Sequence, residues 1–366
     1  MIDAEAALDA LNRWMAARHM RGYWMQEGGG AGAQVTPHLW KWEDVYAGLV
    51  KSGAVVPSGE ARAAGPRRIK IRHPGAAGVP RAVSVGAAIQ MPGELLGPLR
   101  GGANVARFVV QAGAIVTAEG ETFSADAGDL LVWPAGTEGE WRSPGPNPTI
   151  WIECDDAGLL DLVLPGLPVF PLADGQRRSP PKPSGYFAAT RDRMSRADST
   201  RWRPPMRYAW SDAFAALTAL KASDPRGDPH DGIHLRYTSP VDRGPTLPTF
   251  SCAIQLLTPR NATSAHRHNS TAIYHVVRGE GSTEVGGERL DWCEGDVFCV
   301  PPWTWHRHAN PSQQDAILFS VDDWPAMSTL GFYRVENEEE SHELQAIFSE
   351  SRPPFSRRKS SSRATI

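Results

Sequence analysis

Two strand-rich blocks of this 366-residue chain repeat one another, and this repeat limits the fold more than any other feature. The segment from Ile89, IQMPGELLGPLRGGANVARFVVQ, aligns with the segment from Ile254, IQLLTPRNATSAHRHNSTAIYHVVR, when small shifts are allowed. Further along, AGDLLVWPAGTEGEW from Ala127 aligns with EGDVFCVPPWTWHRH from Glu294. Short apolar runs between Gly, Pro and Asn turns predict strands in both blocks. A duplicated unit of about 100 residues with this pattern predicts an all-β fold of two tandem jelly-roll barrels, each a double-stranded β-helix.

Changes in composition along the chain divide it into five predicted segments. They are an N-terminal helical arm (1–66), a first barrel without metal ligands (67–170), a linker rich in Pro, Arg and Ser (171–206), a second barrel with a metal site (207–351) and a disordered tail (352–366). A helix is predicted near the start of the second barrel, over WSDAFAALTALKA, with Ser211 as a candidate N-cap. We therefore expect only a few helices, all peripheral to the barrels.

The composition excludes several classes of function. The net charge is −3 at pH 7, so the chain lacks the basic surface that nucleic-acid binding requires. Apolar residues make up 41% of the chain, yet no run approaches the roughly 20 residues of a membrane-spanning helix. The acidic start MIDAEAALDALNRWM is unlike a secretory signal, and the four cysteines form no CxxC pair. We expect a cytoplasmic protein with reduced cysteines and without nucleic-acid or membrane partners.

The second block carries a pattern typical of a metal site. His266 and His268 are two residues apart, so on a β-strand both imidazoles point to the same face. A later segment, GDVFCVPPWTWHRHAN, brings His306 from a second strand. Neutral imidazoles suit Fe(II), Zn(II) or Ni(II), so the ligand type alone does not identify the metal. The sequence predicts a metal ion inside the second barrel, bound by these three histidines.

The first block has lost the corresponding residues. Leu99, Gly101 and Gly139 stand at the positions of the three histidines, and none of these residue types binds a metal ion. We expect the first barrel to contribute packing, dimerisation and cover for the second barrel. The prediction is therefore one metal ion per chain.

The paired motifs resemble those of the cupin superfamily, and most of the chain resembles the gentisate/salicylate 1,2-dioxygenase family of bicupins. The likeness includes TPHLWKW from Thr36, AHRHNSTAIYHVVRGEG from Ala265, GDVFCVPPWTWHRHAN from Gly295 and LGFYR from Leu330. It implies an Fe(II) enzyme of aromatic hydrocarbon catabolism. Such an enzyme uses O2 to open a small aromatic hydroxy acid between the carboxylate-bearing and hydroxyl-bearing carbons. The resemblance also implies a homo-oligomer, often a tetramer. In this family the iron is commonly held by the N-terminal cupin, so the predicted site lies in the less usual barrel.

The resemblance further implies roles for residues around the metal. The family's active-site Gln corresponds to Gln255, and its His two residues after the third ligand corresponds to His308. The Arg that helps to hold the substrate falls on Tyr274, and the Asp that recognises the 5-hydroxyl of gentisate falls near Ser320. These two replacements favour a salicylate with another substituent, such as 5-nitrosalicylate, over gentisate itself. Many cupins also have a Glu ligand where this chain has Ala272, so three neutral imidazoles leave the metal's charge uncompensated.

Further residues complete the predicted substrate site. Trp303 belongs to a Trp-Thr-Trp-His stretch that is specific to this family, at a position where other cupins usually have Gly. Arg236 is a candidate for the missing carboxylate anchor, because a guanidinium group binds a carboxylate in a bidentate manner. Arg260 in the same barrel and Arg107, acting across an interface, are the other candidates.

Several alternatives remain open at the level of sequence. His308 is either an acid/base group or a structural imidazole bonded to a backbone carbonyl. Gln255 either donates to the substrate or satisfies the interior face of its own strand. The scaffold also suits a non-oxidative isomerase or decarboxylase with Zn, Mn or Ni, or a non-catalytic bicupin binding protein. The binding protein is disfavoured, because one barrel keeps every ligand while the other has lost all three.

Overall fold

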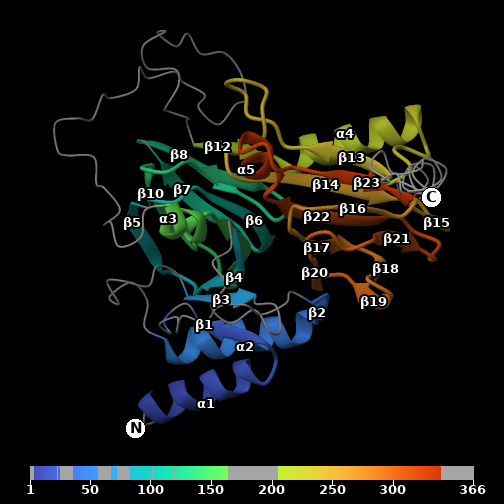
Figure 1. The fold of residues 1–366 in the computed structure, drawn as a ribbon. Coiled ribbons are helices and arrows are strands. Elements are labelled where there is room, and N and C mark those ends of the chain that lie inside the picture. The colour runs from blue at the N-terminus through green and yellow to red at the C-terminus, as the bar shows by residue number, and fades with distance from the viewer. Residues whose placement is uncertain are drawn as a thin grey trace, which may run out of the picture.

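The computed structural model describes residues 4–22, 24, 36–56, 67–71, 83–100, 102–118, 120–163 and 205–338. The predicted tail and all but the last two residues of the predicted linker lie outside the described residues. Two β-barrels stand side by side with a few helices at their edges (Figure 1), so the all-β, two-barrel prediction is confirmed. Within the described ranges, no helix is long and apolar enough to cross a membrane.

The first barrel consists of a seven-stranded and a four-stranded antiparallel sheet. In spatial order the larger sheet contains β1 (Met20–Gly22), β3 (Arg67–Ile71), β4 (Ser84–Gln90), β11 (Thr149–Asp155), β6 (Val105–Gln111), β9 (Leu130–Trp133) and β12 (Met206–Tyr208). The smaller sheet contains β5 (Leu95–Arg100), β10 (Glu138–Arg142), β7 (Ala114–Ala118) and β8 (Glu121–Ala125). The helices on this side are α1 (Ala4–Ala16), α2 (Trp42–Val55) and α3 (Ala157–Val163), of which α2 packs on β3 and β4.

The second barrel consists of two six-stranded sheets. The first contains β13 (Ile233–Arg236), β14 (Ser251–Leu257), β22 (Ala316–Asp322), β17 (Ala272–Arg278), β20 (Val297–Val300) and β2 (His38–Trp40). The second contains β19 (Glu288–Cys293), β18 (Glu280–Val285), β21 (His306–Asn310), β16 (His266–His268) and β23 (Val335–Asn337), with β15 (Asn261–Ala262) paired to β21. Helix α4 (Trp210–Ser223) packs on β13 and β14, and α5 (Trp324–Thr329) follows β22.

Two short strands connect the barrels by backbone hydrogen bonds. Strand β2 belongs to the N-terminal arm in sequence, yet it pairs with β20 of the second barrel, where His38 lies opposite Cys299. Strand β12 lies at the end of the predicted linker and pairs with β9 of the first barrel, where Met206 lies opposite Val132. The sequence-based boundary at 207 therefore falls inside a strand of the first barrel's sheet.

Each of these strands leads into a helix whose first amide is bonded by an aspartate of the barrel that the strand has joined. The Asp296 carboxylate, just before β20, accepts hydrogen bonds from the backbone N of Trp42 and from Lys41 Nζ, both at 2.8 Å. Its side chain is 1% exposed. A glycine precedes it at Gly295, with φ +90°, and a Cβ there would clash with the Trp42 ring at 2.4 Å. The Gly-Asp pair thus fixes where α2 begins.

Asp129 repeats this arrangement in the first barrel. It accepts hydrogen bonds from the backbone N of Trp210 at 2.8 Å and from Arg207 Nε at 2.9 Å. Helix α4 therefore begins at Trp210, and the candidate N-cap Ser211 lies inside the helix, so that prediction is wrong. The amide is satisfied by a residue far away in sequence, which a local capping pattern does not reveal.

Replacing Asp296 by Ala is expected to destabilise the protein by about 2–4 kcal/mol, because a helix cap and a buried carboxylate with several donors are lost together. The measurement is the midpoint of urea unfolding followed by far-UV circular dichroism. Asp291→Ala is the matched control, because its ion pair with Arg289 is 70% exposed on the aspartate side. That control should change stability by less than about 1 kcal/mol. Equal effects of the two substitutions would contradict the role given to Asp296.

A shared apolar core joins the barrels and orients the strands of the second barrel. Phe108 of β6 stacks on Phe319 of β22 with ring centroids 4.4 Å apart. Because side chains alternate along a strand, Ser320 points the other way, into the second barrel. By the same alternation Gln255 on β14 and Tyr274 on β17 face that interior. The fold therefore collects three of the predicted site residues on the inner face of one sheet.

Candidate metal centre

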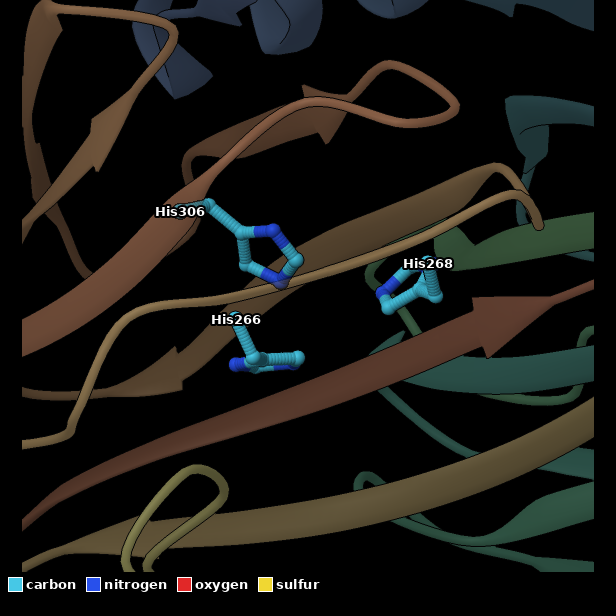
Figure 2. Close-up of side chains that lie close together, drawn as sticks. All are labelled: His266, His268 and His306. Atoms are coloured by element: carbon cyan, nitrogen blue, oxygen red, sulfur yellow. The ribbon is translucent and has the colours of Figure 1, made fainter. Parts of the chain in front are cut away.

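The structure brings His266, His268 and His306 together inside the second barrel. His266 lies directly opposite His306 in the pairing of β16 with β21, and His268 follows on the same face. The ring centroids are 4.2 Å apart for His266 and His306, and 5.0 Å apart for His268 and His306. One nitrogen from each ring lies within 4.8 Å of the other two. Figure 2 shows the three rings gathered around one point.

The hydrogen bonds of the rings fit a metal ion at that point. His306 Nδ1 donates to the Thr304 carbonyl at 3.0 Å, and His268 Nδ1 donates to the Ser270 carbonyl at 2.9 Å. In each neutral ring this leaves the lone pair on Nε2. Within the described part of the chain, His306 Nε2 is buried and has no hydrogen-bond partner. Buried orphaned nitrogens are rare, and a metal ion would satisfy this one.

Burial keeps the three imidazoles in the form that binds metal. It lowers the pKa of His266 to about 4, and the neighbouring His268 and His230 act in the same direction. It lowers the pKa of His306 well below the ordinary value, and His266 and His268 add to this effect. The pKa of His268 is also lowered by burial. At neutral pH the cluster therefore presents neutral nitrogens rather than positive charges that would repel a cation.

The strand that carries the first two histidines is held from outside by Trp303. Its backbone N donates to the His268 carbonyl at 2.7 Å. Its φ is +59°, in the left-handed region that favours glycine, which explains why glycine is usual there. The Arg267 guanidinium lies 4.5 Å from the Trp303 ring and 4.7 Å from the Trp305 ring. Because Arg267 points away from the face of its two histidine neighbours, Trp303 lies on the outer side of β16. Trp303 therefore does not line the interior of the barrel, contrary to the prediction that it belongs to the substrate site.

His308 lies deeper in the barrel, on the same face of β21 as His306. Its Nδ1 is 2.9 Å from Thr283 Oγ1, so it is not bonded to a backbone carbonyl. Its Nε2 is buried and has no hydrogen-bond partner among the described residues. Burial lowers the pKa of His308 to about 3, with a further contribution from His266. Tyr274 meets His308 edge-on, with ring centroids 4.9 Å apart. The structure therefore places His308 beside the triad, 5.9 Å from the His306 ring, and Tyr274 beside His308.

The other predicted residues lie along the same inner face. Arg236, Ser320 and Tyr274 occupy one row across the sheet, because Arg236 pairs with Ala253, Ala253 with Ser320, and Ser320 with Tyr274. The Arg236 guanidinium lies 5.2 Å from the centroid of the Trp324 ring. Within the described part of the chain it forms no ion pair with a carboxylate.

Gln255 is already engaged with the backbone. Its Nε2 donates to the Asp231 carbonyl at 2.6 Å. One of its two amide protons is therefore committed to holding the turn before β13. This contact serves the turn before β13 rather than the strand of Gln255 itself, and the Oε1 and second proton of Gln255 have no hydrogen-bond partner among the described residues.

Two carboxylates that sequence reasoning missed lie at this site. Asp231 influences the ionisation of His266 and His308, and Asp322 lies on β22 two residues beyond Ser320. Burial raises the pKa of Asp322 to about 8, and the nearby Asp323 acts in the same direction. Asp322 is two residues from Ser320 on the same strand, so strand alternation could have predicted that it faces inward. Asp231 lies in a turn, where no periodicity reveals the direction of a side chain.

The first barrel has no room for a side chain at the position that corresponds to His306. Gly139 pairs with Leu99 in the same way that His306 pairs with His266. A Cβ at Gly139 would lie 2.2 Å from the Trp133 ring, so this indole fills the space that a histidine would need.

Arg107 also lies in the interior of the first barrel, among buried indole rings. Its Nε donates to Glu153 at 2.7 Å, and its guanidinium lies 4.7 Å from the Trp141 ring and 5.6 Å from the Trp151 ring. Both Arg107 and Glu153 are buried. Its suggested role as a substrate anchor across an interface is therefore wrong.

Comparison with known proteins gives consistent results. The model of the Cupin domain matches residues 253–322. A 5-aminosalicylate 1,2-dioxygenase of Comamonas sp is 34% identical over 341 residues, which cover 89% of this chain and 89% of that protein. A 1-hydroxy-2-naphthoate 1,2-dioxygenase of Nocardioides sp. (strain KP7) is 30% identical over 91% of this chain and 88% of that protein. A crystal structure of salicylate 1,2-dioxygenase from Pseudoaminobacter salicylatoxidans, with gentisate, has a TM-score of 0.71 at 23% identity and covers 84% of this chain and 86% of the other.

Proposed function

Because this chain belongs to the gentisate/salicylate 1,2-dioxygenase family of ring-cleaving cupin enzymes, we propose that it holds one Fe(II) on His266, His268 and His306. Its proposed substrate is a substituted salicylate, such as 5-amino- or 5-nitrosalicylate, or gentisate. Both atoms of O2 would be inserted as the ring opens between the carboxylate-bearing and hydroxyl-bearing carbons. The observation that carries the proposal is the buried cluster of three neutral imidazoles with nitrogens within 4.8 Å of one another.

Iron is proposed because the reaction needs a single metal ion that binds imidazole and also exchanges electrons. Held by His266, His268 and His306, Fe(II) would supply a Lewis-acidic, redox-active centre for the substrate's carboxylate and phenolate oxygens and for O2. Three protein ligands leave open positions for both reactants, as a catalytic site requires. The missing acidic ligand at Ala272 keeps the 2+ charge available for an anionic substrate.

His308 would donate a hydrogen bond from Nε2 to an oxygen of the reactants. Trp292 Nε1 donates to Thr283 Oγ1 at 2.9 Å, so the Thr283 hydroxyl is free to donate its own proton to His308 Nδ1. The neutral ring then carries its proton on Nε2, the buried atom that has no other partner among the described residues. A donor fixed in this way stabilises negative charge that develops on oxygen, without titrating near neutral pH.

Arg236 is the proposed anchor for the substrate carboxylate, because it shares the inner row with Tyr274 and makes no ion pair with a described residue. Tyr274 and Ser320 would line the pocket between this anchor and the metal. A cytoplasmic location and assembly as a homotetramer belong to the same proposal. The four cysteines are free, which is consistent with a reducing compartment. Light scattering coupled to size-exclusion chromatography measures the assembly.

The proposal predicts O2 uptake by the Fe(II)-reconstituted protein with at least one of gentisate, salicylate, 5-amino- or 5-nitrosalicylate and 1-hydroxy-2-naphthoate. An oxygen electrode measures the uptake, and mass spectrometry of the product made under 18O2 shows whether both oxygen atoms enter it. Zn(II)-loaded protein is the control and should consume no O2. Absence of uptake with all five compounds, in protein shown to contain iron, would overturn the proposed activity.

A further inference from the structure

The strand that carries two of the three proposed ligands is short and lies beside the edge of its sheet. Strand β16 contains only His266–His268, and its neighbours are β21 and the edge strand β23 (Figure 1). Its pairing with β21 aligns a single pair of residues, His266 with His306. On the other side, β23 is three residues long and its Val335 is 53% exposed. Such neighbours give β16 little backbone support, so side-chain contacts decide how firmly its imidazoles are held.

Arg267, which lies between the two ligands, makes such contacts on the outer face of the strand. Its guanidinium carbon lies 4.5 Å from the centroid of the Trp303 ring and 4.7 Å from that of the Trp305 ring. Its Nε donates to the Glu336 carboxylate of β23 at 2.9 Å. Two aromatic rings and one carboxylate therefore hold this cation. We call Arg267, Trp303, Trp305 and Glu336 the outer clamp.

The loop that supplies the two indoles also contacts the ligands of both strands. The backbone N of Trp303 donates to the His268 carbonyl at 2.7 Å. The next residue, Thr304, accepts a hydrogen bond on its carbonyl from His306 Nδ1 at 3.0 Å. The loop leads directly into β21. Contacts of Arg267 that fix this loop therefore fix the third ligand as well as the first two.

The backbone of Trp303 is strained. Its φ of +59° lies in the left-handed region, where a bulky residue is an outlier. Such strain persists only where the surrounding contacts compensate for it, and it gathers at functional sites. The Trp303 ring is 40% exposed, so the burial of its apolar surface offsets little of the strain. The compensating contacts are the hydrogen bond to His268 and the approach of Arg267 to the ring.

We propose that the outer clamp is a positioning device for the metal centre, in which Arg267 keeps β16 and the loop before β21 where the three imidazoles meet one ion, and thereby slows the release of the metal. The inference rests on the proposed metal centre and adds a positioning residue to it. Arg267 touches neither the metal nor the substrate, because it points to the opposite face from His266 and His268.

The other ligand strand provides a matched control. Arg307 follows His306 as Arg267 follows His266, it also points outward, and its Nε donates to Glu284 at 2.9 Å. Its side chain is 50% exposed, against 25% for Arg267. Among the described residues, no aromatic ring lies over its guanidinium. The two arginines therefore differ in the aromatic part of the clamp.

The test loads metal-free protein with Co(II), whose visible absorption reports its coordination geometry, and follows the release of Co(II) to excess EDTA. Arg267→Met should release Co(II) about 10- to 100-fold faster than the wild type, the usual effect of losing a group that orients metal ligands. Arg267→Lys keeps a cation near the rings and should recover part of the loss. Arg307→Met should release Co(II) at the wild-type rate. Equal rates for Arg267→Met and Arg307→Met would overturn the inference.

The thermal midpoint of each metal-free protein, measured by circular dichroism, separates positioning from overall stability. Trp303→Gly removes one ring of the clamp and places a residue suited to a φ of +59°. Its midpoint should not fall, yet it should release Co(II) faster than the wild type. Unchanged release in Trp303→Gly would overturn the inference. Faster release only in variants whose midpoint falls below that of Arg307→Met would do the same, because stability would then explain it.

The same measurements distinguish this inference from the proposed function. If the wild type binds Co(II) but its iron form opens no ring, the proposed activity fails, and the release rates still decide the role of Arg267. If the wild type binds Co(II) and the Arg267 variants release it no faster, the metal centre stands and the inference is rejected. If the wild type binds no Co(II), the metal centre and the inference are rejected together.

Discussion

His306→Ala is expected to reduce ring cleavage by a factor of about 10³ or more, because a mononuclear site that loses one of three ligands no longer holds the metal that the reaction needs. His306 is the ligand that comes from the second strand, and its ring is the nearest to His266, at 4.2 Å. The measurement is the initial rate of O2 uptake with the best substrate of the wild type. Folding is checked by the near-UV circular dichroism spectrum.

His230→Ala is the matched control for that result. The His230 ring lies 5.4 Å from the His266 ring, yet it does not belong to the group of ligand nitrogens. This variant should retain its iron and keep kcat within about 10-fold of the wild type, a limit typical of a group near the ligands rather than among them. If His306→Ala retained substantial activity, or if the two variants behaved alike, the assignment of ligands would be wrong.

His308→Ala is expected to lower kcat by about 10²–10³-fold, the usual effect of removing a fixed hydrogen-bond donor from a buried active site. Iron content should not change, because His308 is not one of the grouped ligands. His308→Gln should recover part of the loss, since a glutamine amide also donates a proton. Stopped-flow and steady-state rates separate kcat from KM. A fall in iron content that parallels the fall in rate would instead show that His308 supports the metal.

Thr283→Val tests the direction of this hydrogen bond. The hydroxyl at 2.9 Å from His308 Nδ1 is replaced by a methyl group of similar shape, so the ring is free to carry its proton on either nitrogen. We expect a decrease in kcat of about 10-fold, smaller than that of His308→Ala. An unchanged kcat would show that the Thr283 contact has no influence on the reaction.

The sequence was most informative where strand periodicity and residue spacing determine the direction in which a side chain points. His266 and His268 are two residues apart on a strand and therefore share a face, and the repeated blocks predicted the barrel that brings His306 to them. The same alternation placed Tyr274 correctly on the inner face. Repetition also revealed the loss of ligands in the first barrel. Gly139 was found by comparing blocks, although the Trp133 ring that fills its space could not be foreseen.

Features that depend on long-range contacts or special backbone geometry were not predictable. Strand β2 is three residues long and pairs with residues about 260 positions later in the sequence, a distance that no local pattern spans. Trp303 carries a positive φ that turns its ring to the outer side of β16. Arg107 is neutralised by Glu153, a pair that only the register of β6 and β11 brings together. Asp231 lies in a turn and has no periodicity at all.

The central claim is one metal ion per chain, held in the second barrel. Its most direct test is the metal content of the purified, Fe(II)-reconstituted protein by inductively coupled plasma mass spectrometry, in the wild type, His266→Ala and Trp133→Phe. The account predicts one iron per chain in the wild type, none in His266→Ala, and one in Trp133→Phe, which changes only the filled interior of the first barrel. Two irons per wild-type chain, or iron that persists in His266→Ala, would contradict it.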